Sequence, residues 1–201
     1  MAASYWASIQ AREFFETRSM KLAEATHPLV PTAQYLSAIA HHVSSVCVIT
    51  TAVDGERFGL TATAVSSVSA DPPRLLVCVN KSGTTHEKIV AVGRFGVNVL
   101  AEGQDKIAMV FAGLHGLKGD RFATGEWTTL KTGSPILVGA SAAFDCVLAE
   151  MSQQSTHSVL FGDVVATQHR VGEDTLLYGA RRFRQLRKVF AGLHGGQGEY
   201  L

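Results

Sequence analysis

The feature that most constrains the fold is a short run of β-branched residues followed by a tight turn. Residues 46–53 read Val-Cys-Val-Ile-Thr-Thr-Ala-Val, a composition that favours a strand and a length too short for a buried helix. Asp54-Gly55 follows directly, and this dipeptide favours a two-residue hairpin because glycine tolerates a positive φ. The sequence therefore predicts a β-hairpin whose returning segment passes through Phe58.

Further short strands, separated by turns, follow this hairpin. The returning segment extends to Ser69 and ends at Asp71-Pro72-Pro73. Many short strands with glycine turns and few helices predict a mainly β protein, an antiparallel barrel with peripheral helices. The later strands are expected over 74–79, 95–100, 135–139, 143–150, 158–167 and 175–178, and helices over 32–42, 85–92 and 104–112.

Composition argues against several classes of protein. The 201 residues are 46% hydrophobic and 17% charged, so the chain can bury a core rather than stay disordered. A formal net charge of +1 supplies no basic excess for nucleic acid. Cys47, Cys78 and Cys146 lie far apart in apolar stretches, which favours free buried thiols over disulfides or a zinc site. No apolar run approaches the ~18 residues that span a bilayer, and we expect a soluble, cytoplasmic protein.

The two ends of the chain differ from its middle. Residues 4–25 predict an amphipathic helix whose apolar stripe needs a partner surface, such as a second subunit. The predicted organisation is an N-terminal helical extension over 1–32, one domain over 33–190 and a tail over 191–201. Residues 110–116, Val-Phe-Ala-Gly-Leu-His-Gly, recur as residues 189–195, and the sequence gives this repeat no meaning.

The segment from Asn80 to Glu87 carries the first candidate site. A turn leads into Thr84-x-x-Glu87, the pattern of a capping box, and Gly93 suits the end of the helix. Free N–H groups and the positive end of the helix dipole favour a phosphate there. Lys81 adds a positive charge, and hydroxyl donors come from Ser82, Thr84 and Thr85. An ordinary capped helix is the alternative interpretation.

Two other features are candidates for chemistry. Between Thr61 and Ser69, small hydroxylated residues alternate with Ala and Val beside Gly59, so that a planar ring can approach the backbone. The alternative is a Ser/Thr-rich edge strand. His157 stands at a strand entrance, in either a structural or a functional role. The chain lacks the Gly-x-Ser-x-Gly, Walker, Gly-x-Gly-x-x-Gly and His-Glu-x-x-His motifs.

Taken in order, these segments resemble the short-chain flavin reductases, the reductase components of two-component flavin-dependent monooxygenases. The resemblance covers about residues 33–190 and implies a six-stranded, Greek-key split β-barrel that binds flavin as a homodimer. The matching segments are Gly59–Pro73, Asn80–His86, Phe95–Leu100, Gly119–Phe122, Gly133–Leu137 and His157–Val164, followed by Tyr178.

The resemblance also implies roles for individual residues. His157 lies at the nicotinamide site, where the family's Gly-Asp-His element here reads Ser155-Thr156-His157. The flavin phosphate is held by Asn80, Ser82 and Thr85. The isoalloxazine and ribityl chain are lined by Thr61, Thr63, Ser66 and Ser67. Arg121 and Tyr178 lie near the flavin or the nicotinamide.

The activity implied is that of an NAD(P)H:flavin oxidoreductase. NADH or NADPH passes a hydride from nicotinamide C4 to N5 of FAD or FMN, and the protein binds and aligns the two. Reduced flavin then leaves for a separate oxygenase, which suits a roughly micromolar flavin affinity. Two alternatives stay open: an enzyme with tightly bound flavin, and a split-barrel flavin- or haem-binding protein without turnover.

Overall fold

The computed structural model describes residues 27–114 and 119–186, which divide into two units between Ile39 and Ala40. The first unit contributes one helix, α2 (Thr32–Ile39), three residues shorter than the helix expected over 32–42. The helix expected over 4–25, the tail over 191–201 and the second copy of the repeat lie outside the described residues. All other elements belong to the second unit.

The second unit is mainly β, as expected, with two α-helices, α3 (Thr84–Val92) and α4 (Asp105–Phe111), and one 3-10 turn, η1 (Arg121–Ala123), among its described residues. No helix in the described ranges is both long and apolar enough to cross a membrane. The strands are β1 (Ser44–Ser45), β2 (Cys47–Val53), β3 (Glu56–Ala62), β4 (Val65–Ala70), β5 (Pro73–Asn80), β6 (Arg94–Val99), β7 (Trp127–Thr129), β8 (Pro135–Leu137), β9 (Ala142–Gln154), β10 (His157–His169), β11 (Leu177–Gly179) and β12 (Arg182–Arg184).

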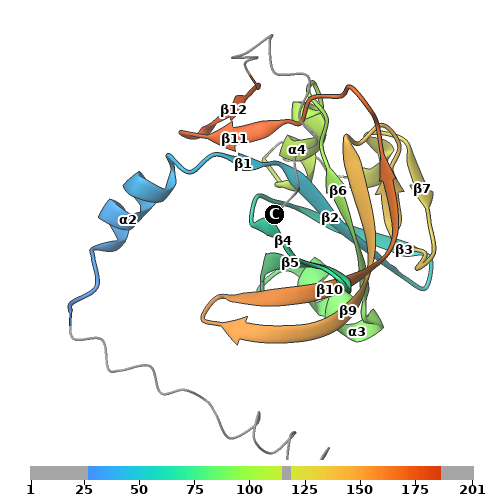
Figure 1. Ribbon diagram of the computed structural model, residues 1–201, viewed down its shortest axis with the longest axis horizontal. Helices are drawn as coiled ribbons and strands as arrows, with labels where there is room; N and C mark the ends of the chain where they lie inside the picture. The colour runs from blue at the N-terminus through green and yellow to red at the C-terminus, as the bar shows by residue number, and fades with distance from the viewer. Residues whose placement is uncertain (1–26, 115–118, 187–201) are drawn as a thin grey trace, which may run out of the picture. The chain divides into compact units, whose positions relative to one another are not determined.

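Seven of these strands form one antiparallel sheet in the order β3-β2-β6-β9-β10-β5-β4 (Figure 1). The sheet thus has one strand more than the six expected. Two small sheets, β1-β11-β12 and β7-β8, accompany it. The predicted hairpin is confirmed, because Asp54 (φ 50°) and Gly55 (φ 81°) form the turn between β2 and β3.

The segment expected as one strand over 58–69 is two strands. β3 ends at Ala62 and β4 begins at Val65, and these two strands occupy opposite ends of the sheet order. Thr63 and Ala64 therefore connect the two edges of the sheet. The Cys78 N–H donates to the Ala64 carbonyl at 3.0 Å, which holds this link against β5.

The two helices are held by apolar side chains on either side of β2. Val48 belongs to one buried cluster together with Phe111 of α4, whereas Ile49 belongs to a second cluster together with Ile89 of α3. All four side chains are at most 2% exposed. Full burial of one such side chain contributes about 1.5–3 kcal/mol, so these contacts fix both helices against the sheet.

Candidate functional site

Two connected clefts contain most of the residues singled out in the sequence. The strand cleft has a volume of about 530 Å³ and is lined by residues 60–64, Cys78, Asn80, Ser82, Gly83, Phe111, Ala112 and His157. The helix cleft has a volume of about 830 Å³ and is lined by residues 55–60, 82–85 and 119–122. They share Leu60, Ser82 and Gly83, and both volumes lie within the ~300–1,000 Å³ usual for ligand pockets.

Strand alternation places polar side chains in the strand cleft. Along β5, Val77 and Val79 are buried in the core, so Cys78 and Asn80 face the opposite side, where they line the cleft. His157 of β10 is directly opposite Asn80 in the ladder, and it too lines the cleft. The Thr156 hydroxyl lies 2.9 Å from His157 Nδ1, which restrains the exposed imidazole.

The turn after β5 is built by the Asn80 side chain. Asn80 Oδ1 accepts hydrogen bonds from the Ser82 N–H and the Ser82 hydroxyl, each at 2.9 Å. The Lys81 N–H donates to the Thr156 carbonyl at 3.0 Å, which ties the turn to β10. The exposed Lys81 side chain lines a neighbouring depression beyond Ser82 instead of either cleft.

The beginning of α3 differs from the expected capping box. Thr84 is the first helical residue and Gly83 is the N-cap, so no side chain caps the first turn. The backbone N–H groups of Thr84 and Thr85 are thus left to a ligand or to water, in a stretch that lines the helix cleft. Thr85 itself is 7% exposed. The end of the helix is as expected, with Gly93 at φ 65° and its N–H donating to the Ile89 carbonyl at 2.8 Å.

The hydroxylated segment divides between the cleft and the sheet edge. Thr61 and Thr63 line the strand cleft, and the Thr61 hydroxyl donates to the Ala108 carbonyl at 2.7 Å. Ser66 and Ser67 are exposed on the edge strand β4 and line neither cleft.

Gly59 makes room for one of the protein's own aromatic rings, that of Phe111. A Cβ atom at Gly59 would lie 2.7 Å from Phe111 Cε1.

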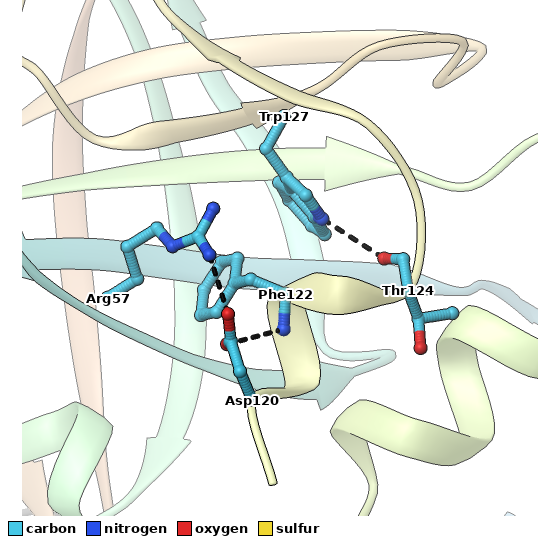
Figure 2. Close-up of polar contacts among 5 residues, drawn as sticks. All are labelled: Arg57, Asp120, Phe122, Thr124 and Trp127. Carbon is cyan, nitrogen blue, oxygen red and sulfur yellow. Dashed lines mark hydrogen bonds and ion pairs between the residues drawn. The ribbon is translucent and has the colours of Figure 1, made fainter.

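An arginine and an aspartate that sequence reasoning missed form one wall of the helix cleft. Arg57 Nη2 donates to Asp120 Oδ2 at 2.7 Å, and Asp120 Oδ1 accepts the Phe122 N–H at 2.9 Å (Figure 2). The Arg57 guanidinium lies 4.7 Å from the centre of the Phe122 ring. The predicted residue Arg121 also lines this cleft, with Nη1 3.4 Å from the Gly59 carbonyl. Arg57 left no motif because its partner lies 63 residues away.

Behind this wall, three aromatic rings pack together. Phe122 forms edge-to-face contacts with Phe111 and with Trp127, at centroid distances of 5.0 and 4.9 Å. The Trp127 Nε1–H donates to the Thr124 carbonyl at 3.1 Å, as Figure 2 shows. The Phe122 ring beneath Arg57 is therefore itself packed against two further aromatic rings.

Tyr178 lies apart from both clefts. It lines a small, mostly apolar cavity of about 180 Å³ with Phe183, and the two rings meet at 5.5 Å. Thr61 and Thr63 line this cavity as well as the strand cleft. The end of β3 therefore separates Tyr178 from His157.

His86, which sequence reasoning left without a role, joins α3 to β10. Its Nε2 lies 2.9 Å from the hydroxyl of Ser158, a fully buried residue next to His157. Burial lowers the pKa of His86, and the positive charge of Lys81 lowers it further. The imidazole is therefore neutral at neutral pH.

The fold and the clefts define a class of mainly β proteins with a ligand-sized cleft at the start of a helix. Residues 39–187 match the family model described as the flavin reductase like domain, and the chain belongs to that family. The FMN reductase (NADH) RutF of Ancylobacter novellus is 42% identical over 159 residues, which are 79% of this chain and 87% of the relative.

Solved structures of flavin reductases share the fold. The NADH:FAD oxidoreductase SgcE6 of Streptomyces globisporus C-1027, in complex with NAD and FAD fragments, has a TM-score of 0.74 and 29% identity, covering 81% of this chain and 99% of the other. BorF, the flavin reductase component of a bacterial two-component tryptophan halogenase, has a TM-score of 0.71 and 31% identity, covering 78% and 98%.

Proposed function

We propose that this protein is an NADH- or NADPH-dependent flavin reductase that supplies reduced FMN or FAD to a separate oxygenase. The observation that carries the proposal is the strand cleft, whose open end is the uncapped beginning of α3. The residues present fit a flavin nucleotide, because a strand with small side chains would lie against a planar ring while the free N–H groups at the start of α3 would face its phosphate. Bound flavin supplies the chemistry by accepting a hydride at N5 from C4 of the nicotinamide.

The protein's own residues bind and orient. Thr61 and Thr63 would line the ring and ribityl chain. Asn80 shapes the turn that carries Ser82, and Ser82 together with Thr85 of α3 would bind the phosphate. His157, across from Asn80, would position the nicotinamide. Lys81 would add positive charge, and Arg121 in the helix cleft would lie near the flavin or the nicotinamide. Tyr178 lines a separate cavity that shares Thr61 and Thr63 with the strand cleft, so it would lie nearer the flavin than the nicotinamide. Ser66 and Ser67, which line neither cleft, are left out of this assignment.

We further propose that the sheet is a split barrel and that the protein works as a homodimer in the cytoplasm. The short link between β3 and β4 and its hydrogen bond to Cys78 support the barrel. The position of β4 at the edge of the sheet supports a second subunit there, and three free cysteines support a reducing compartment. The proposed organisation keeps the extension over 1–32, the domain over 33–190 and the tail over 191–201.

The N-terminal segment is proposed to stabilise the dimer. Deleting residues 1–25 is expected to weaken the dimer, and an unchanged mass in light scattering would contradict this role of the segment.

NADH oxidation at 340 nm tests the function. The purified protein is assayed without flavin and then with FMN, FAD or riboflavin, and we expect turnover that rises with added flavin. Turnover that needs no added flavin, with flavin retained on a desalting column, would indicate a tightly bound cofactor instead. Flavin binding without NADH oxidation would indicate a binding protein.

A further inference from the structure

We propose that Arg57 is a specificity-determining residue that favours FAD over FMN by stacking against the adenine of FAD in the helix cleft. This inference rests on the proposed function and assigns a role to a residue outside the strand cleft. It depends on three observations: the space beyond the phosphate position, the contacts of Arg57 with Asp120 and Phe122, and the distribution of charge around Arg57.

The space comes from the connection between the two clefts. A flavin ring in the strand cleft, with its phosphate at the start of α3, would occupy only the Ser82–Thr85 edge of the helix cleft, whose volume is about 830 Å³. FMN ends at that phosphate, whereas FAD continues into a second phosphate, a ribose and adenine. The mononucleotide would therefore reach only the edge of the helix cleft at Ser82–Thr85, whereas the dinucleotide would extend further into it.

The contacts of Arg57 with Asp120 and Phe122 orient its guanidinium before any ligand binds. Asp120 holds one edge at 2.7 Å, and the ring of Phe122 lies under one face at 4.7 Å from its centre. Phe122 is only 5% exposed, so the ring itself is not offered to a ligand. The side chain of Arg57 is 39% exposed and lines the cleft, and a planar guanidinium is a stacking surface for a base.

The two arginines of this wall, Arg57 and Arg121, differ in whether a carboxylate pairs with them. The positive charge of Arg57 is matched by Asp120, so Arg57 chiefly offers a flat surface. Arg121 forms no ion pair with any carboxylate in the described ranges, and it lines the same cleft. Arg121 is thus available to bind the second phosphate of FAD, and Arg57 is available to stack against the adenine.

The experiment compares FAD with FMN on the same variant. Kd for each flavin is measured by quenching of flavin fluorescence, and KM by NADH oxidation, in wild type, Arg57→Gln, Arg57→Lys and Arg74→Gln. Arg74 is the matched control, since it pairs with Asp163 at the same 2.7 Å and lines neither cleft. We expect the ratio of Kd for FAD to Kd for FMN to rise about tenfold in both Arg57 variants, the factor that 1.4 kcal/mol of binding represents. Arg74→Gln keeps the wild-type ratio.

Three results overturn the inference. If the ratio of Kd for FAD to Kd for FMN is unchanged in Arg57→Gln, Arg57 does not contact the adenine. If that ratio stays at its wild-type value in Arg57→Lys, the site recognises the positive charge and not a flat surface. A rise confined to KM for NADH assigns the cleft to the adenosine of the nicotinamide nucleotide instead. Failure of the proposed function is distinct, because wild-type protein would then bind flavin without oxidising NADH, and the two Kd values would still be measurable.

Discussion

Asn80 and His157 lie directly opposite each other in the antiparallel ladder of β5 and β10, although 76 residues separate them. One residue begins the turn into α3 and the other begins β10. The ladder therefore fixes the distance between the proposed phosphate site and the proposed nicotinamide site by backbone hydrogen bonds, without help from a flexible side chain.

Replacing His157 with alanine tests its proposed role at the nicotinamide. We expect KM for NADH to rise about tenfold, a loss of about 1.4 kcal/mol, with the melting temperature unchanged because the side chain is exposed. The measurement is steady-state NADH oxidation with saturating FMN. Gln154, exposed and opposite His157 on β9, provides the control Gln154→Ala. Equal effects of the two substitutions on KM for NADH would show that His157 does not position the nicotinamide.

Thr85→Val tests the phosphate site at the beginning of α3. A hydrogen bond to a charged group contributes about 1.5–3 kcal/mol, so KM for FMN is expected to rise at least tenfold. Riboflavin, which lacks the phosphate, serves as the comparison on the same protein and is expected to change little. Thr51→Val removes another buried hydroxyl, one that donates to the Arg94 carbonyl at 2.9 Å, and should leave the FMN-to-riboflavin ratio as it is.

The three cysteines are expected to react with a maleimide in a fixed order. Burial raises the pKa of both Cys47 and Cys146 to about 12, which keeps these thiols protonated, whereas Cys78 is partly exposed and lines the strand cleft. Mass spectrometry should find Cys78 labelled first, and added FMN should slow the labelling. Labelling that FMN leaves unaffected would place the flavin elsewhere.

The environment of His86 predicts a pH dependence of stability. Burial, assisted by Lys81, lowers the pKa of His86 from its usual 6.5, so the unfolded chain takes up a proton first as the pH falls. The neutral state thus contributes stability above pH 6.5, and this contribution is lost as the pH falls from 6.5 toward the lowered pKa. Urea unfolding of wild type and His86→Gln between pH 8 and 5 measures this; the curve of the variant should fall less. Parallel curves would show that His86 is not the group involved.

Gly59→Ala tests the contact between β3 and α4. The new methyl group would overlap the ring of Phe111, and overpacking of this kind typically costs about 1–3 kcal/mol of unfolding free energy. Chemical denaturation measures the loss. Adding Phe111→Leu should recover part of the lost stability, whereas additive losses in the double variant would mean that the ring is not the obstacle.

Local chemistry explains what the sequence predicted. The β-branched run before Asp54-Gly55 and the glycine after α3 were recognised because each is decided by residues next to one another. The division of residues 58–69 at Thr63-Ala64 was missed, since the same alternation of hydroxylated and small residues runs through it. The three-residue strands β7 and β12 were also missed, because such short strands form only where a distant partner is in place.

In the site too, features set by neighbouring residues could be predicted, whereas features that depend on distant partners could not. The turn from Asn80 to Ser82 and the helix start after it could be inferred, whereas the capping box was wrong because Gly83, and not a threonine, is the N-cap. Arg57 was missed because its function depends on Asp120, which a motif search in one segment does not connect to it.

The order of strands in the large sheet has a consequence for how the protein is made. β5 is complete when residue 80 has been synthesised, but its partner β10 begins only at His157. Until then, β5 can pair only with β4, and the turn after it lacks the neighbour that β10 provides. Closing so long a loop is slow compared with forming the β2–β3 hairpin. The nascent chain would therefore carry most of the proposed binding residues before the strand opposite Asn80 exists, so the proposed site is completed only when the second half of the domain folds.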